Sequence, residues 1–357
     1  MGSTASDPLL HAADLVLRAW TRVGPSEVPA TPRAHDAGLD LVVTDRTVVA
    51  TDQDVVSFQL AAPDGERLPK WRPGAHLDVH LPSGRKRQYS LCGDPTDRTS
   101  YRIAVRRIPA QSGGLGGSVE MHDLPVGSTL QVSRPRNAFP LAVPGHGSPA
   151  ERLHFVAGGI GITPILPMVR LADALDVDWT MVYVGRRRDT LPFLDELAAY
   201  GERVVIRTDD TDGLPTAADL LVGVDTGTAV YCCGPVPMID VLRTGLLDRT
   251  DVEFHSERFS APPVVDGRAF TLELENTGEV FEVPADRSPL DVLAEAYPAI
   301  PYSCRQGFCG TCKLTVIEGD ADHRDGSLTA DERAAGCLLP CVSRAQGDRL
   351  VVRADLH

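Results

Sequence analysis

The sequence predicts a multidomain protein that combines β and α/β folds, and the changes of rhythm along its 357 residues carry that prediction. Between residues 39 and 148, short apolar segments alternate with turns and no long helix intervenes, which indicates an antiparallel β-barrel. Between residues 149 and 260, buried strands alternate with helices, which is typical of a parallel α/β sheet. Residues 261–357 return to short strands and hold five of the eight cysteines.

The individual elements follow from the apolar periodicity and from the turn residues between them. In the first region, strands are expected at 40–50, 55–60, 76–81, 87–91, 101–107 and 129–133. In the second region, strands are expected at 153–156, 180–184, 203–208 and 229–232, and helices at 164–175, 193–200, 217–221 and 236–246. In the last region, strands at 269–274 and 279–283 precede a helix near 289–296. Residues 1–38 are expected to form an extension, a short helix followed by a proline-rich linker.

Composition limits the function. No apolar run approaches the 18 residues of a membrane span, and His11, Asp14 and Arg18 interrupt the N-terminal apolar stretch that a secretory signal would need. We therefore expect a cytoplasmic protein without a membrane anchor. The net charge of −14 argues against nucleic-acid binding. Residues 261–357 hold 16 acidic and nine basic side chains, which predicts either docking on a basic patch of a partner or a solubilising acidic surface.

The cysteine spacing is the most specific signal. Cys304, Cys309, Cys312 and Cys341 give C-x4-C-x2-C-x28-C, the plant-type spacing of four thiolates around a [2Fe–2S] cluster. An alternative is a zinc site made by Cys309, Cys312, Cys337 and Cys341, which leaves Cys304 without a role. Eight cysteines in this length are too sparse for a disulfide framework. The remaining Cys92, Cys232 and Cys337 are interpreted as small buried apolar residues.

Two short motifs in the first region suit a flavin. In Arg87-Gln88-Tyr89-Ser90, the guanidinium can pair with a phosphate, the phenol ring can line the flavin plane and the hydroxyl can reach N5. The glycines and serine of Gly116-Gly117-Ser118 can open an anion site for the flavin phosphate. An exposed strand end and a plain loop are the respective structural alternatives.

The second region offers candidates for a nicotinamide dinucleotide. Gly158-Gly159-Ile160-Gly161-Ile162-Thr163-Pro164 follows a strand and opens a helix, so its backbone can approach a pyrophosphate, although it is not G-x-G-x-x-G. Cys233-Gly234-Pro235 ends another strand at the ligand-binding edge of the sheet. Arg186 and its two neighbouring arginines could meet the adenosine end of the cofactor. Tight turns and a solvated arginine are the alternatives.

The order of these motifs resembles the phthalate dioxygenase reductase family over residues 40–357. Segments 133–141, Glu257-Arg258-Phe259 and 341–345 add to the resemblance. It implies a flavin barrel, a nicotinamide domain and a C-terminal β-grasp ferredoxin domain, with domain limits expected at 1–38, 39–148, 149–260 and 261–357. It implies the following cofactor-binding residues: Arg87, Tyr89, Ser90, Gly116, Gly117 and Ser118 for FMN, and Gly159, Gly161, Thr163, Pro164, Arg186, Cys233 and Gly234 for NADH. Phe259 would cover the flavin ring, and Ser90, Cys233 and Phe259 would be the catalytic residues.

The function implied by the resemblance is electron transfer from NADH through FMN and the [2Fe–2S] cluster to a partner oxygenase. A Rieske-type oxygenase or demethylase is the expected partner, bound by transient electrostatic docking. No histidine or carboxylate is nominated as acid or base. Leu115 stands where relatives often carry arginine, so FAD remains an alternative, as does NADPH, and Arg106 or Arg107 could replace the missing cation. A cytochrome P450 partner and a redox-sensing iron–sulfur flavoprotein are the alternative functions.

Overall fold

The computed structural model describes residues 38–51, 54–109, 111, 114, 116–145, 148–259, 261–297, 300–302 and 304–354. Apart from Gly38, the expected N-terminal extension lies outside these residues, and so does Leu115. The part of the chain from Gly38 onward packs as one unit. Within the described ranges, no helix has the length and apolar character of a membrane span.

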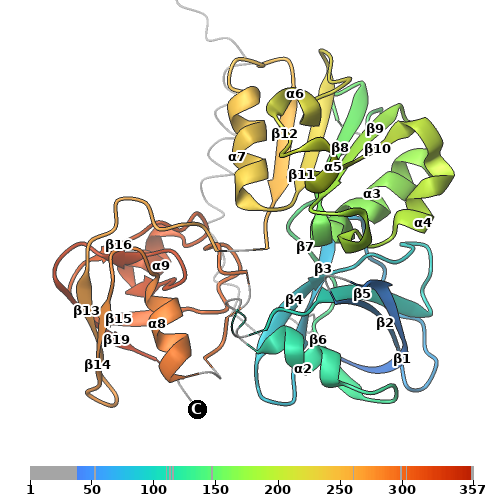
Figure 1. Cartoon of the computed structure of the whole chain (residues 1–357). Coiled ribbons are helices and arrows are strands. Elements are labelled where there is room, and N and C mark those ends of the chain that lie inside the picture. The colour runs from blue at the N-terminus through green and yellow to red at the C-terminus, as the bar shows by residue number, and fades with distance from the viewer. Residues whose placement is uncertain are drawn as a thin grey trace, which may run out of the picture. The chain divides into compact units, whose positions relative to one another are not determined.

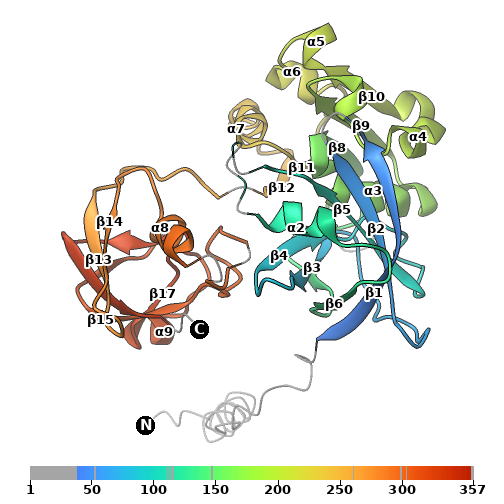
Figure 2. The same ribbon diagram turned by 60° about the horizontal axis from the view of Figure 1, so that its bottom comes forward.

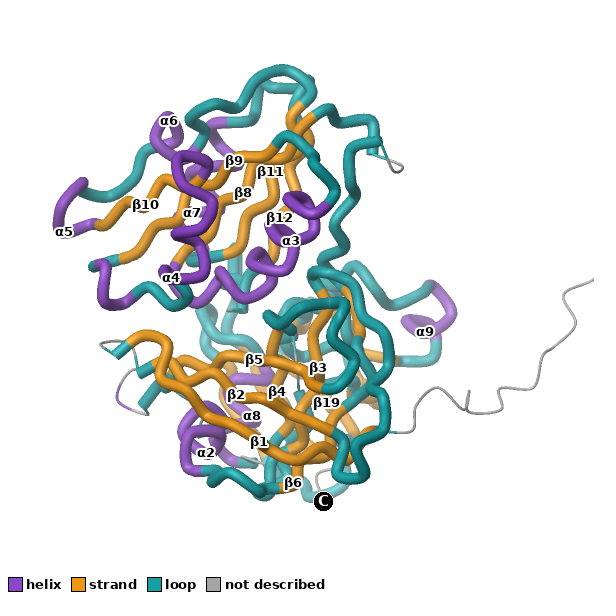
Figure 3. Tube along the Cα trace, turned by 90° about the vertical axis from the view of Figure 1, so that its right-hand side faces the viewer, coloured by secondary structure: helices purple, strands orange, loops and turns teal. Residues whose placement is uncertain are grey.

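The first region folds into a curled antiparallel sheet with the order β4-β3-β6-β1-β2-β5, and β7 pairs with β3 (Figure 3). Its strands are β1 (Leu39–Ala50), β2 (Val55–Ala61), β3 (Ala75–His80), β4 (Lys86–Ser90), β5 (Ser100–Arg106), β6 (Thr129–Val132) and β7 (Arg136–Asn137). All six expected strands are present to within one residue at each end. No ladder joins β4 to β5 among the described residues, but a single bridge between Leu91 and Ile103 links the two ends of the sheet. The barrel is therefore not fully closed.

The second region is a five-stranded parallel sheet with the order β10-β9-β8-β11-β12. Its strands are β8 (Arg152–Gly158), β9 (Trp179–Gly185), β10 (Val204–Thr208), β11 (Thr228–Cys233) and β12 (Glu253–Glu257). The direction of strand succession reverses between β8 and β11, and ligands of such sheets bind at the carboxyl ends of the strands beside this point. β12 was not expected from the sequence, because Glu-Phe-His-Ser-Glu lacks the apolar content of a buried strand.

Helices cover both faces of this parallel sheet (Figure 1). They are α3 (Ile162–Ala174), α4 (Leu194–Leu197), α5 (Asp209–Asp212), α6 (Ala217–Leu220) and α7 (Val236–Gly245). On the face of α3, the sheet presents Phe155, Met181 and Tyr231, and on the face of α6 and α7 it presents the valines that alternate with them. The helix expected at 193–200 is shorter, since α4 gives way to a 3₁₀ segment (Ala198–Arg203) whose Gly201 has φ 56°.

The first two regions share one hydrophobic cluster, in addition to a separate cluster within each region. Ala50, Cys92 and Phe139 of the first region pack in the same buried cluster as α3 and the adjoining face of the parallel sheet. Beside it, Arg102 donates two hydrogen bonds to Glu196, of 2.8 and 3.1 Å, and Arg170 also pairs with Glu196. Strand β5, which carries Arg102, is thereby joined to α4 of the second region.

The third region has a core of its own beneath a mixed sheet with the order β14-β13-β19-β15-β17 (Figure 2). Its strands are β13 (Phe270–Leu274), β14 (Val280–Val283), β15 (Leu314–Glu318), β17 (Cys337–Leu338) and β19 (Arg349–Arg353), with β16 (Ala321–Asp322) paired to β18 (Arg344–Ala345). Helix α8 (Pro289–Ala296) lies where the sequence predicts it, because Ser288 and Asp291 cap its first turn and Leu290 and Leu293 enter the core. A mixed sheet with such a helix agrees with the expected β-grasp domain.

Candidate redox site

One cavity of about 600 Å³ is lined by all three regions. Its walls include many of the residues that the sequence nominates, namely Arg87, Tyr89, Ser90, Gly117, Ser118, Gly161, Thr163, Gly234, Phe259 and Cys304. The motifs come from segments more than 200 residues apart in the chain, so their convergence is a result of the fold rather than of sequence proximity.

Arg87 occupies the cavity wall at β4, next to helix α2 (Gly117–Asp123). A Cβ on Gly117 would lie 2.5 Å from Arg87 Nε, so only glycine lets the guanidinium lie against this backbone. The guanidinium also stacks on the Tyr302 ring, 4.2 Å from its centroid. A half-buried cation beside a backbone cradle that a Cβ would fill suits the phosphate of a flavin. Burial raises the pKa of Tyr89, which keeps its phenol neutral.

The other predicted residues of the phosphate loop are also accounted for. Ser118 Oγ accepts a hydrogen bond of 2.9 Å from the Ile108 N–H, so this hydroxyl anchors the preceding loop. Gly116 has φ 80°, a conformation that favours glycine. Of the two arginines proposed to replace a cation at position 115, Arg106 lines the cavity, whereas Arg107 forms an ion pair with Asp54 at 3.6 Å.

The two glycine turns of the parallel sheet pack against each other. A Cβ on Gly161 would collide with the Cys233 carbonyl, and one on Gly158 would lie 2.6 Å from the Pro235 ring. The close approach of these turns therefore requires the glycines, while the exposed side of the turns opens to the cavity. By contrast, nothing lies within 4 Å of a Cβ built on Gly159, which has φ 53°.

Thr163 lines the cavity, but the predicted nicotinamide residues Gly159, Pro164, Arg186 and Cys233 do not. Cys233 is fully buried at the end of β11, and burial raises the pKa of its thiol well above the ordinary value. Thr163 Oγ1 donates to the Ile160 carbonyl at 3.0 Å, and Pro164 is buried in the first turn of α3. Arg186 is exposed at the end of β9, and its charge contributes to lowering the pKa of Arg106, which burial lowers most. Arg186 thus marks an electropositive corner near the cavity.

The sequence reasoning missed Glu257 as a site residue. Glu257 ends β12 in register with Cys233, lines the cavity, and has its Oε2 buried without a hydrogen-bond partner. Burial raises the pKa of this carboxyl to about 8. The only sequence signal was the Glu257-Arg258-Phe259 motif, which entered as part of the family resemblance and assigned no role to the carboxylate.

Glu257 should make stability fall as the pH rises. The Glu257 carboxyl has a pKa of about 8 in the folded chain and is protonated below that pH, whereas the pKa of an ordinary glutamate is 4.5. Between these values unfolding releases a proton, so the free energy of unfolding decreases with pH by up to about 1.4 kcal/mol per unit. We expect Glu257→Gln to remove this slope, with a melting temperature that increasingly exceeds that of the wild type from pH 5 to 8. Parallel melting curves for the two proteins would contradict the prediction, and Glu202→Gln, on the surface, is the control.

The four predicted cluster ligands converge around the loop 304–312. Cys304, Cys312 and Cys341 are buried and Cys309 is half-buried. The thiols meet in two pairs, Cys304 with Cys309 and Cys312 with Cys341, while among the described residues no three ligand side chains surround a single ion position. Two pairs of thiolates suit the two irons of a [2Fe–2S] cluster. The donor set therefore fits the cluster.

The loop backbone is shaped for the same purpose. Arg305, Gly307 and Gly310 all have positive φ, of 57°, 77° and 72°, which curls the loop around the thiols. The Gln306 N–H donates to Cys304 Sγ at 3.3 Å, as N–H groups do in iron–sulfur sites. Of the cysteines interpreted as buried apolar residues, Cys92 and Cys232 are fully buried, but Cys337 is only half-buried because it lies on the edge strand β17.

Two contacts connect the cluster loop to the rest of the cavity. Arg258 Nε donates to Gln306 Oε1 at 3.3 Å, and Gln306 Nε2 donates to the Arg258 carbonyl. On the other wall, Tyr302 lies against Arg87. The loop that carries Cys304 is thus fastened both to the end of the parallel sheet and to the flavin motif.

Comparison with known proteins agrees with this arrangement. Residues 272–346 match the 2Fe-2S iron-sulfur cluster binding domain family. The phthalate dioxygenase reductase of Burkholderia cepacia is 37% identical over 90% of this chain and 99% of its own. The vanillate O-demethylase oxidoreductase of Pseudomonas putida is 39% identical over 88% of this chain and 99% of its own.

Two solved structures are also similar. A phthalate dioxygenase reductase, described as modular for electron transfer from pyridine nucleotides to [2Fe-2S], has a TM-score of 0.65 and 36% identity, and the match covers 88% of this chain and 98% of that one. The full-length CYP116B46 of Tepidiphilus thermophilus has a TM-score of 0.64 and 36% identity, with 97% of this chain and 45% of that chain covered.

The fold, the shared cavity and the paired thiols define an NAD(P)H-dependent flavin and iron–sulfur oxidoreductase of the kind that serves oxygenases. With relatives of 37–39% identity along nearly its full length, the chain belongs to the phthalate dioxygenase reductase family.

Proposed function

We propose that this chain carries electrons from NADH, through FMN and a [2Fe–2S] cluster, to a Rieske-type oxygenase or demethylase. The observation that carries the proposal is the single cavity, whose wall contains the flavin motif, the glycine turns and Cys304. When bound, the flavin supplies the conversion of a hydride donor into a source of single electrons. A short distance between the flavin site and the cluster loop is what such a conversion needs.

The protein's own residues would bind and orient these groups. Arg87, with the backbone at Gly117, would hold the flavin phosphate, and Tyr89 would line the ring. The buried Ser90 hydroxyl would hydrogen-bond the ring, and Phe259, which is 46% exposed, would cover it where the nicotinamide enters. Cys233 would act by holding the turn at Gly161 and Gly234, since its thiol is buried and neutral.

FMN and NADH are the specific cofactors of this proposal. Arg106 and Arg87 supply two cations at the cavity wall, which suits the terminal phosphate of FMN. The carboxylates of α5 lie beside Arg186, whose carbonyl accepts from the Asp210 N–H at 3.2 Å, and they would repel the 2′-phosphate of NADPH. We place the protein in the cytoplasm, since all eight cysteines are free and iron–sulfur ligands need reduced thiols.

An anaerobic titration with NADH, followed by visible absorbance, tests this function. Bleaching of flavin bands together with the broad iron–sulfur absorbance should consume about three electrons per chain, two for the flavin and one for the cluster. Flavin bleaching without the broad absorbance would reject the cluster, and the electron-transfer route with it. The same titration with NADPH measures the preference for the donor.

Electron delivery to the partner should depend on salt. The cluster-bearing region is acidic, with 16 acidic and nine basic residues, so we expect it to dock through complementary charge. Raising the ionic strength from about 0.01 to 1 M shortens the screening length from about 30 to 3 Å and should slow delivery to the oxygenase. Stopped-flow measurement of NADH-to-flavin transfer is the internal control, because that step lies within the chain. Equal rates of delivery at both salt concentrations would count against electrostatic docking.

A cytochrome P450 is the second candidate for the electron acceptor. The observation that favours it is the likeness of nearly the whole chain to part of a type IV self-sufficient cytochrome P450 monooxygenase at 36% identity. Reconstitution with a Rieske-type oxygenase and with a P450 under the same conditions separates the two by which one turns over with NADH.

A further inference from the structure

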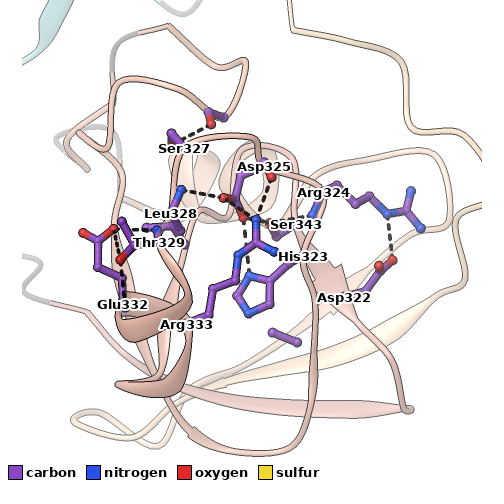
Figure 4. Close-up of polar contacts among 12 residues, drawn as sticks. Asp322, His323, Arg324, Asp325, Ser327, Leu328, Thr329, Glu332, Arg333 and Ser343 are labelled. Carbon is purple, nitrogen blue, oxygen red and sulfur yellow. Dashed lines mark hydrogen bonds and ion pairs between the residues drawn. The ribbon is translucent and has the colours of Figure 1, made fainter. Parts of the chain in front are cut away.

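A buried polar network lies beside the cluster loop, centred on Asp325 (Figure 4). The Asp325 carboxylate, whose side chain is fully buried, accepts hydrogen bonds from the Leu328 N–H at 3.0 Å, from Arg333 at 3.2 Å and from Ser343 Oγ at 3.2 Å. His323 Nδ1 lies 3.4 Å from it. Burial opposes ionisation of this carboxyl, but the Leu328 N–H and Arg333 outweigh it and its pKa is lowered. A buried carboxylate whose hydrogen-bonding capacity is satisfied in this way makes the surrounding segments rigid.

The network joins the two separate segments that supply cluster ligands. Ser343 follows Cys341 by two residues and is itself fully buried; its Oγ also accepts from the Arg324 N–H at 3.2 Å. On the other side, Ser327 Oγ donates to the Gly307 carbonyl at 2.9 Å. The segment around Asp325 is therefore hydrogen-bonded to both ligand-bearing segments. It contacts the segment of Cys341 through Ser343, and the loop 304–312 through the carbonyl of Gly307.

Gly307 shows how close this contact is. A Cβ at this position would lie 2.6 Å from Val342 Cγ2 and 3.2 Å from Asp325 Cα. The Gly307 N–H donates to the thiol of Cys341. The hydrogen bond between the loop and the fourth ligand thus exists only while the loop lies against the segments on either side of Asp325.

We propose that Asp325 is a positioning residue of the iron–sulfur site, which clamps the segment carrying Cys341 against the loop carrying Cys304, Cys309 and Cys312. The proposal rests on the proposed function, because it assumes that these thiols hold the cluster. Hydrogen bonds to the sulfurs tune the reduction potential of such clusters. Loosening the clamp weakens the bond from Gly307 to Cys341, makes the cluster harder to reduce and exposes the iron.

The test compares Asp325→Asn, Ser343→Ala and Ser327→Ala in the full chain with its cluster. Asp325→Asn keeps the shape of the side chain but removes its charge, and we expect about tenfold faster release of iron to a chelator, as for a lost charge-assisted hydrogen bond. The two serine variants change no charge, and each should release iron about threefold faster and shift the cluster potential to more negative values. Asp331→Asn, the same change at an exposed position of α9 (Ala330–Ala334), should behave as the wild type.

Three outcomes would overturn the proposal. Iron release at the wild-type rate in all three variants would show that Asp325 does not clamp the two ligand-bearing segments together. A more positive potential in Asp325→Asn, with unchanged iron release and unchanged serine variants, would show that the carboxylate acts only through its charge. Serine variants that melt earlier but keep the wild-type potential and the electron paramagnetic resonance signal of the reduced cluster would show a purely structural role. A wild-type protein without any cluster would instead reject the proposed function, so the two failures are distinguishable.

Discussion

Cys341→Ser should abolish electron delivery to one-electron acceptors while leaving the reduction of the flavin by NADH intact. Cys341 is the distant member of the pair that it forms with Cys312, and its removal leaves one iron with a single protein ligand. Even the groups that only support metal ligands change affinity by 10–100-fold, so the loss of a ligand should lower cytochrome c reduction by at least about 100-fold. Flavin reduction, followed by stopped-flow absorbance, involves residues of the other two regions and should keep its rate.

Cys337→Ser is the matched control. Cys337 lies in the same domain and is half-buried on β17, but it takes no part in the two thiol pairs. We expect its replacement by serine to leave both rates unchanged. Zinc bound to the wild-type protein, lost in Cys337→Ser and in Cys341→Ser but retained in Cys304→Ser, would identify instead a redox-inactive zinc site of Cys309, Cys312, Cys337 and Cys341.

Arg87→Ala should weaken flavin binding by about 10–100-fold, as expected when a charge-assisted hydrogen bond worth roughly 1.5–3 kcal/mol is lost. Arg87 is the cation that lies against Gly117 in the cavity wall. The measurement is titration of the flavin-free protein with FMN, followed by quenching of flavin fluorescence, and with FAD for comparison. The change is confined to flavin affinity, so the absorbance of the iron–sulfur cluster should persist.

Arg85→Ala provides the comparison for Arg87. Arg85 immediately precedes β4, two residues before Arg87, and pairs with Glu120 at 3.5 Å, but it does not line the cavity. Its removal should change the affinity for FMN by less than about threefold, because its guanidinium pairs with Glu120 and lies outside the cavity wall. Similar losses in both variants would mean that general positive charge, rather than the placement of Arg87, binds the phosphate.

The sequence predicted the strands of the first region closely, because alternating side chains and glycine turns are local signals. It failed for β12, whose polar residues are tolerated because the strand lies at the edge of its sheet. The shortened helix at α4 was also missed, since residues 198–200 continue it as a 3₁₀ segment and the apolar pattern does not distinguish this from an α-helix. These differences arise where neighbours in space, rather than in sequence, decide the conformation.

The residues of the candidate site were predictable where their function requires particular residue types at fixed intervals in the sequence. The four cluster cysteines and the Arg87 motif could be named because their residue types and intervals are unusual. Glu257 and Asp325 could not, since an aspartate or glutamate in a sequence carries no mark of burial. Their significance depends on an unpartnered oxygen in one case and on three hydrogen-bond donors in the other, and both are properties of packing.

The division of the interior into cores has a consequence for how such a protein can change over time. The first two regions share buried side chains, so a substitution in one must be accommodated by the other. The third region buries its own set and meets its neighbours through polar and stacking contacts such as Arg258 with Gln306. Recombination at the connecting segment near residue 261 could therefore exchange the iron–sulfur module without rebuilding the reductase, whereas a junction near residue 149 would cut through a common interior.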